Sequence, residues 1–443
     1  MNDLTKGSIS KGLILFTLPL LLGNFFQILY HTTDTIIVGQ TLGKLALASV
    51  GATGAVNFLI VGFAQGLTSG LTIVTAQRFG AKHFQDVKKS FATGLVFTVI
   101  ASLILSILSV IFIGPLLKMM QTPDEIFEGA KTFMTFMLGG MIFANLFNFL
   151  SNALRALGDS KTPLYALVIS SIANIILEYT AILGLGWGIA GASIATVAAQ
   201  AISVCYLAYH ISQKVPELHF PTEYLKFDKN EFKEHARLSL PMGFQSSIIA
   251  IGSITLQIAL NTLGTNAVAT QSIVSKVDQF AMLPMISIGL AMSTFAAQNY
   301  GAQKYKRIIS GLKQATLISV VWGIIYAILL ITFNHQVTTV FISPSETAVI
   351  NMAKQYYIIN GAFYWLLAIL FSTRGTIQGL GNSKIPTLAG FMELFMRAGV
   401  AIYGVHRMSY TIVVASNPAA WIGSILVLIP TILVTVRSFK KLS

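Results

Sequence analysis

The chain has 443 residues, of which 54% are hydrophobic and only 10% are charged, and its mean hydropathy is +0.73. An ordinary soluble domain carries about 25% charged residues, so this composition excludes a soluble protein and indicates a polytopic membrane protein. The formal net charge of +13 does not indicate a nucleic-acid binder, because the basic residues are spread over many loops and do not gather on one soluble face.

Apolar runs long enough to span a bilayer recur along the whole chain. A transmembrane helix needs about 20 apolar residues. In the first half such runs lie at 13–38, 51–77, 91–117, 131–155, 163–184 and 188–212. In the second half they lie at 236–260, 271–297, 311–333, 349–373, 384–405 and 417–437. We therefore predict an all-α polytopic membrane protein with twelve transmembrane helices.

Lysine and arginine residues alternate between the two sides of these spans. One set of loops is rich in them, whereas the opposite set holds little more than Lys44, Lys118, Lys131 and Arg407. The positive-inside rule then places both termini in the cytoplasm. We predict a multi-pass protein of the plasma or inner membrane that contacts the lipid bilayer, does not bind nucleic acid and is a monomer.

Short motifs in the first half return in the second half at a nearly constant spacing. The repeated pairs are Leu157–Pro163 with Leu380–Pro386, Thr41–Gly43 with Thr262–Gly264, and Ala76–Ala81 with Ala297–Ala302. Each half holds an even number of spans, so the halves are parallel repeats related by a pseudo-twofold axis along the membrane normal. We predict an N-lobe at 1–214, a cytoplasmic linker at 215–235 and a C-lobe at 236–443. Paired lobes of this kind are typical of transporters with a central site.

Two acidic residues of the first half fall inside predicted spans, where an ionisable side chain costs roughly 2.5–3.5 kcal/mol on insertion scales. Asp34 lies one turn after Tyr30 on the first span, and Glu178 lies one turn after Asn174 on the fifth. The i, i+4 spacing places each pair on one helix face. At 1.5 Å per residue both carboxylates lie about 8–9 Å inside the outer helix end. We predict that they share a polar pocket. The alternative is that Asp34 forms a hydrogen bond with His31 or faces the outer water, and that Glu178 extends to the membrane interface.

The fourth span adds Asn145, Asn148 and Asn152, whose spacing places them on one face. Two buried carboxyl groups close together do not both ionise readily, so such a pocket can take up and release a proton. Carboxylate and amide oxygens can instead coordinate Na⁺, and the sequence leaves both ions open. We predict that the cation-coupling residues are Asp34, Glu178, Asn174, Tyr30, Asn148 and Asn152.

Other chemistry is not indicated. The seven histidines show no metal-ligand spacing, and no phosphate-binding loop of the Walker type is present, so we expect no cofactor, no metal site and no enzymatic activity. The energy source is then an ion gradient.

Weaker signals lie in the second half. Methionine and aromatic side chains suit an adaptable apolar cavity, although lipid-facing or core packing is the more common fate of such residues. The candidate substrate-cavity residues are Phe280, Met282, Met285, Met292, Met392 and Met396, together with Asp278. We expect Glu393 and Arg397 to form a structural i, i+4 ion pair, and Arg374 to extend its side chain toward the interface.

The chain resembles the multidrug and toxic compound extrusion (MATE) family over essentially its whole length. The likeness is carried by Leu18-Pro19, by Asp34-Thr35-Ile36-Ile37-Val38-Gly39, by the repeated Ala-Gln helix ends and by the doubled Leu-Gly-Asp/Asn-Ser-Lys-x-Pro motif. The resemblance implies two six-helix lobes that export cationic amphipathic compounds in exchange for H⁺ or Na⁺.

Within that family the chain is most similar to the DinF-type branch. There a first-helix aspartate and a fifth-helix Asn-x-x-x-Asp form the cation site, which implies Asp34, Asn174 and Glu178 here, with Tyr30 beside them. Glu178 departs from the pattern by one methylene. The seventh span has no acidic residue, so we expect the C-lobe carboxylate site of the NorM-type branch to be missing. An alternative is a lipid-linked precursor or polysaccharide flippase of the same superfamily, for which about fourteen helices and a cationic cavity are expected.

Overall fold

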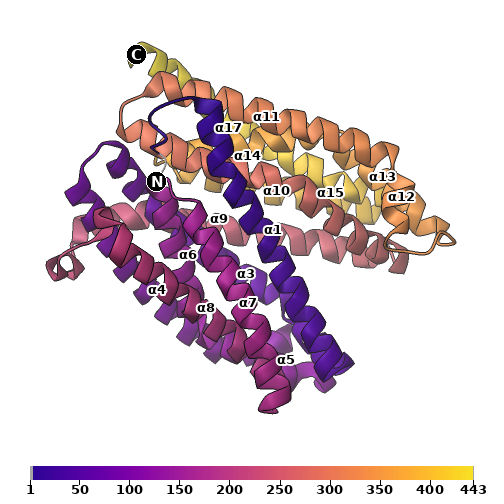
Figure 1. Cartoon of the computed structure of the whole chain (residues 1–443). Helices are drawn as coiled ribbons and strands as arrows, with labels where there is room; N and C mark the ends of the chain where they lie inside the picture. Colours follow the sequence, from indigo (N-terminus) through magenta and orange to yellow (C-terminus); the bar gives the residue numbers. More distant parts are fainter. Residues whose placement is uncertain (1–2, 443) are drawn as a thin grey trace. The chain divides into compact units, whose positions relative to one another are not determined.

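The computed structural model describes residues 3–442, and over this range the chain is helical with no strand (Figure 1). Ten helices in this range are long and apolar enough to cross a membrane, and two bent helix pairs bring the number of possible spans to twelve. The prediction of an all-α polytopic membrane protein is confirmed.

The first half of the chain forms eight α-helices and one π-helical turn. They are α1 (Ile9–Leu42), α2 (Lys44–Ala52), α3 (Gly54–Gly80), α4 (Phe84–Met119), α5 (Asp124–Gly139), α6 (Met141–Ala156), α7 (Lys161–Tyr179), the π turn η1 (Thr180–Gly184) and α8 (Gly188–Lys214). The linker contains two short 3₁₀ turns, η2 (Pro216–Leu218) and η3 (Thr222–Leu225).

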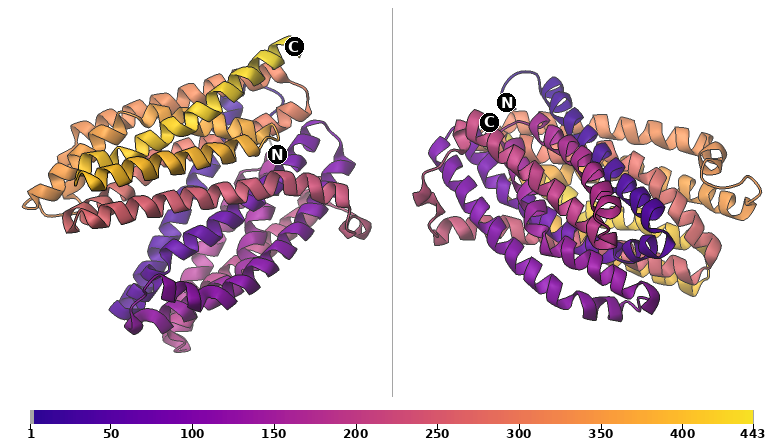
Figure 2. Two further views of the ribbon diagram at one scale, coloured as in Figure 1. Left: turned by 180° about the vertical axis from the view of Figure 1, so that it is seen from behind. Right: turned by 60° about the horizontal axis from the view of Figure 1, so that its bottom comes forward.

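The second half, as far as Leu442, forms nine α-helices. They are α9 (Lys229–Thr262), α10 (Thr265–Gly301), α11 (Tyr305–Thr332), α12 (Asn334–Thr339), α13 (Thr347–Gly361), α14 (Tyr364–Gly379), α15 (Lys384–His406), α16 (Tyr410–Val414) and α17 (Ser416–Leu442). By direct contact α10 lies beside α14 and α15 lies beside α17. Figure 2 shows the helices of this half from two further sides.

Two of the predicted spans are broken helices. The helices α5 and α6 meet at a bend of 46°, and α13 and α14 meet at a bend of 49°. Gly140 stands at the first break, where a Cβ atom would lie only 2.3 Å from Cγ1 of Val197 on α8. Only glycine therefore lets α8 pack this closely against the bend. Met141 and Tyr364, which begin α6 and α14, occupy corresponding places in the two copies of the repeat, so the bend belongs to the repeat.

The doubled Leu-Gly-Asp/Asn-Ser-Lys-x-Pro motif ends one helix and starts the next. Gly158 and Gly381 adopt φ values of 89° and 82°, the left-handed conformation that terminates many helices. In both copies the N–H of the residue after the glycine bonds back to a carbonyl of the preceding turn, Asp159 to Leu154 and Asn382 to Ile377. The sequence repeat is thus a repeated helix stop.

Asp159 also caps the helix that follows. Its carboxylate accepts hydrogen bonds from the backbone N–H groups of Lys161 and Thr162 at 3.0 Å and from the Thr162 hydroxyl at 2.6 Å. Asn382 accepts one such bond, from the N–H of Ile385 at 3.3 Å. These caps satisfy donors that the first helical turn leaves free and fix the start of α7, which carries Glu178.

Packing divides the chain into two compact units. Unit 1 comprises Leu18–Gly243, and unit 2 comprises Leu4–Thr17 together with the chain from Phe244 onward. The helices α1 and α9 each contribute to both units and change unit beside Pro19 and Pro241, which correspond in the repeat. Proline removes one helical hydrogen bond, so each helix passes from one unit to the other where its own hydrogen bonding is weakest. The predicted lobe boundaries near 214 and 236 stay a prediction.

Candidate functional site

The two acidic residues of unit 1 lie together inside the helix bundle. Asp34 on α1 is 9% exposed, and Glu178 on the last turn of α7 is fully buried. The two carboxyl groups lie close enough to interact electrostatically. The π turn η1 begins two residues after Glu178, and π-helical turns are frequent at functional sites because they widen a helix locally.

Thr196 on α8 joins the two helices that carry the acids. Its hydroxyl lies 3.4 Å from Oδ1 of Asp34, and Nδ2 of Asn174 donates to the same hydroxyl at 3.2 Å. The hydroxyl also lies 3.1 Å from the carbonyl of Ala192, and since it carries one proton it serves one of these acceptors at a time. The buried hydroxyl of Tyr30 lies near Thr196 and both carboxyl groups.

Acceptor oxygens outnumber donors at this site. Both carboxyl oxygens of Glu178 and Oδ1 of Asn174 are buried and accept no hydrogen bond from residues 3–442. Buried polar atoms nearly always have a partner, and within the described chain neither acid forms an ion pair. A proton or a small hard cation would complete such a set of oxygens. No group of three His, Cys, Asp or Glu residues that could hold a metal ion lies together in the described range.

The repeat that organises the fold is also the repeat of a known family. The MatE family model matches residues 19–180 and matches residues 241–402 a second time. The chain belongs to the MATE family of transporters. Both matches begin at the prolines beside which α1 and α9 change unit.

Individual relatives agree with this assignment. The probable multidrug resistance protein YoeA of Bacillus subtilis is 29% identical over 434 residues, which cover 96% of this chain and 93% of the relative. The probable multidrug resistance protein NorM of Thermotoga maritima is 24% identical over 427 residues, which cover 94% of this chain and 89% of the relative. A crystal structure of MATE in the straight conformation superimposes with a TM-score of 0.90 at 22% identity, covering 99% and 98% of the two chains.

These findings confirm the predicted class. The MATE chain is a multi-pass membrane protein with the two-lobed transporter fold, it handles small substrates, and it is not an enzyme.

Two predicted site residues of the MATE chain lie on α6, apart from the acidic pair. Asn152 donates to the hydroxyl of Ser69 at 3.2 Å and accepts a hydrogen bond from Arg155 at 3.1 Å, so its amide is engaged toward α3 and within its own helix. Asn148 is partly buried one turn earlier. Their part in cation coupling stays a prediction. Thr196, which does join the site, was not predicted, because a threonine inside an apolar span most often bonds its own helix backbone.

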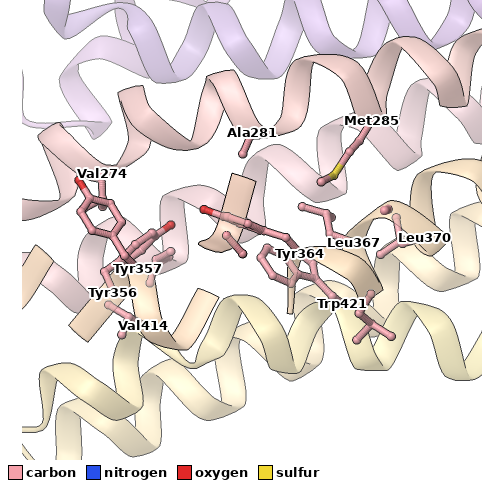
Figure 3. Close-up of a cluster of buried hydrophobic side chains, with 14 of the residues drawn as sticks. Val274, Ala281, Met285, Tyr356, Tyr357, Tyr364, Leu367, Leu370, Val414 and Trp421 are labelled. Atoms are coloured by element: carbon pink, nitrogen blue, oxygen red, sulfur yellow. The ribbon is translucent and has the colours of Figure 1, made fainter. Parts of the chain in front are cut away.

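The candidate substrate-cavity residues are spread over unit 2. Met285 and Met292 are fully buried, and Figure 3 shows Met285 in the hydrophobic core with Tyr364 and Trp421. Met282 is partly buried against the same core, Phe280 is 47% exposed, and Met392 and Met396 of α15 pack against Gly423 of α17. A role for these side chains in substrate binding stays a prediction.

Unit 2 contains a buried carboxylate of its own, on α10. Asp278 is 5% exposed, and its two oxygens accept hydrogen bonds from the hydroxyls of Tyr356 and Tyr364. Tyr356 lies before the bend between α13 and α14, and Tyr364 lies after it, so the bend directs both hydroxyls to one carboxylate. Figure 3 shows these tyrosines in the core of unit 2.

The ion pair of α15 forms with a different partner from the one expected. Glu393 pairs with Arg374 of α14 and not with Arg397 one turn along its own helix. Arg374 also donates to the hydroxyl of Ser424 on α17 at 3.1 Å. The expectation that Arg374 extends to the interface is wrong, since the side chain is buried and directed inward by these two partners.

Proposed function

We propose that the chain is a secondary active multidrug exporter that couples the outward movement of cationic amphipathic compounds to the inward movement of H⁺. The observation that carries this proposal is the buried pair of neighbouring carboxyl groups, Asp34 and Glu178, with two Glu178 oxygens that no donor of the described chain satisfies. Such a pair changes its charge whenever it gains or loses a proton.

The geometry favours a proton over Na⁺ as the coupling ion. Two ionised carboxylates close together in a dry site repel each other, and one proton on the pair removes this repulsion. Na⁺ would also use the free oxygen of Asn174, so it is the competing occupant. The two ions give opposite results in the experiment described below.

Coupling follows from the charge of the pair. With fewer protons the pair attracts a cationic substrate, and with more protons that attraction falls, so proton entry from outside releases the substrate there. Linkage requires that substrate and proton each change the affinity for the other by the same factor. Asp34 lies on α1, a helix that contributes to both units, so a change at this carboxylate acts on an element that the two units share. We place both termini in the cytoplasm and treat the transporter as a monomer.

The test is export of a fluorescent cationic amphiphile from proteoliposomes under an imposed pH gradient or an imposed Na⁺ gradient. We expect the parent to respond to the pH gradient, and Asp34→Asn and Glu178→Gln to lose that response. Glu178→Asp retains a carboxyl group and is expected to keep part of the response. Glu223→Gln, an exposed linker carboxylate, is the matched control and should behave as the parent.

The outcomes separate the alternatives. A response to Na⁺ alone, lost in the same two variants, keeps the site and changes the ion. Parental export in both Asp34→Asn and Glu178→Gln rejects the site. No export of any cationic amphiphile, together with movement of a lipid-linked precursor across the same membrane, replaces the exporter with the flippase.

A further inference from the structure

Arg397 takes the place in unit 2 that Asn174 of the acidic site takes in unit 1. The doubled motif just before α7 and α15 aligns Leu157 with Leu380, and the same alignment carries Asn174 onto Arg397. Aligning Pro19 with Pro241 carries Tyr30 onto Gly252. These two counterparts are in contact, because a Cβ atom on Gly252 would lie 2.7 Å from Nη1 of Arg397. A guanidinium group therefore occupies the repeat-related position of the acidic site.

The positive charge of Arg397 has no acidic partner of its own within residues 3–442. Glu393 is paired with Arg374. Nε and Nη1 of Arg397 are buried without a hydrogen-bond acceptor from the described chain, and Nε of Arg374 is in the same condition. The one carboxylate near the two arginines is paired with Arg374, which leaves the positive charge of Arg397 in excess and several N–H donors unused.

The location makes this excess charge significant. Arg397 lies thirteen residues after Lys384, the first residue of α15, which is about 20 Å along the helix at 1.5 Å per residue. The hydrocarbon core is about 30 Å thick, so the guanidinium lies deep within it. A buried cation at this depth is expected to have a counter-charge or a function. The other buried acid of unit 2, Asp278, is engaged elsewhere, since its oxygens accept from Tyr356 and Tyr364.

We propose that Arg397, supported by Arg374, binds a small monovalent anion, either a free halide or the carboxylate of a zwitterionic substrate. Guanidinium N–H groups are strong donors to such anions and hold them by charge-assisted hydrogen bonds. The backbone of Gly252 borders the guanidinium, and Leu394 lies beside the same glycine, since a Cβ atom there would lie 2.7 Å from Nη1 of Arg397 and 3.7 Å from Cδ1 of Leu394. This site lies in a different unit from the acidic pair and does not depend on the proposed coupling ion.

The first arm of the test measures a free anion. Purified protein in lipid nanodiscs is unfolded by heat while gluconate, a larger and strongly hydrated anion, is replaced by chloride at constant ionic strength. We expect a saturable rise in the unfolding temperature of the parent, and no rise in Arg397→Gln. Lys276→Gln removes an exposed cation from the same unit and should keep the rise.

The second arm measures a substrate carboxylate. Binding of a rhodamine with a free carboxylate is compared with binding of its methyl ester. A charge-assisted hydrogen bond corresponds to about tenfold or more in affinity, so the parent should prefer the carboxylate form by at least about this factor, and Arg397→Gln should bind both forms equally. Saturating chloride should compete with the carboxylate form if the two share the site.

The two arms together decide the proposal. An Arg397-dependent effect of chloride alone identifies a free ion as the occupant, and an Arg397-dependent preference for the carboxylate dye alone identifies the substrate group. The absence of both effects in the parent, or their survival in Arg397→Gln, overturns the proposal. Should Arg397→Gln fail to elute as folded protein, Arg397→Lys replaces it, because it keeps the charge, loses the fork of donors and is expected to weaken binding about tenfold.

Discussion

Unit 1 and unit 2 begin from the same repeat and hold opposite charges at corresponding places. In unit 1 the two carboxyl oxygens of Glu178, beside Asp34, have no donors in the described chain. In unit 2 the counterpart position holds Arg397, with donors that lack acceptors there. The helix stops, the bends and the prolines are common to both units, whereas the buried charges are not. Duplication therefore preserved the architecture and left each unit free to acquire a different ligand chemistry.

The same comparison separates a structural carboxylate from a ligand-binding one. Asp278 is nearly as buried as Glu178, but two tyrosine hydroxyls satisfy its oxygens. Glu178 has no such donors among residues 3–442. A satisfied acid needs no ligand for its stability, and an unsatisfied acid does. Burial and acidity alone do not mark a coupling site, and the missing donors do.

The largest expected effect concerns stability and tests which arginine of unit 2 is paired. Glu393→Gln removes the carboxylate that pairs with Arg374 and leaves the charges of Arg374 and Arg397 without a nearby acid. Breaking a buried pair in this way costs about 3–5 kcal/mol. Arg397→Gln removes the excess charge and is expected to leave stability unchanged or to raise it when no small anion is present. Thermal unfolding of both variants in gluconate measures the difference.

A reversal of that order would contradict the pairing. If Arg397→Gln lowers the unfolding temperature as much as Glu393→Gln does, then Arg397 and not Arg374 is the main partner of Glu393. The double variant Arg374→Leu with Glu393→Leu is the control, because it removes both partners together and is expected to cost much less than Glu393→Gln.

The next effect concerns coupling and transfers the chemistry of unit 2 into unit 1. Asn174→Arg places a guanidinium beside Asp34 and Glu178, where it supplies a permanent positive charge. Coupling energies of about 1–3 kcal/mol correspond to affinity changes of roughly 5–150-fold. We expect substrate affinity to vary with pH within this range in the parent and to become independent of pH in Asn174→Arg. Fluorescence titration with a cationic amphiphile at several pH values measures both.

Asn174→Gln is the matched control for this substitution, since it lengthens the side chain without adding charge and should keep the pH dependence. Parental pH dependence in Asn174→Arg would show that the guanidinium does not reach the carboxyl pair or that the pair is not the coupling site. Circular dichroism of each variant verifies that the helices are intact.

The sequence predicted the parts that depend on length, composition and spacing. Apolar runs located the spans, and the i, i+4 pairs placed Asp34 and Glu178 on inward faces of their helices. The sequence did not predict contacts between helices that lie far apart along the chain. Thr196 resembles any threonine in an apolar span, so nothing in the sequence marked it. Glu393 pairs with Arg374 on another helix, whereas the i, i+4 spacing on its own helix favoured Arg397. The bend at Gly140 was missed because the apolar run continues through it.

The smallest expected effect compares the two copies of the doubled motif. Asp159 accepts three hydrogen bonds at the start of α7, and Asn382 accepts one longer bond at the start of α15. Loss of a cap costs about 0.5–2 kcal/mol, so we expect Asp159→Ala to lie near the upper part of this range and Asn382→Ala near the lower end. The unfolding temperatures of the two variants provide the measurement. Equal losses would mean that the helix stop at Gly158 and Gly381, and not the cap, carries the stabilisation. In either case Asp159→Ala should keep pH-dependent substrate binding, because Thr196 and α1, and not the start of α7, set the surroundings of Glu178.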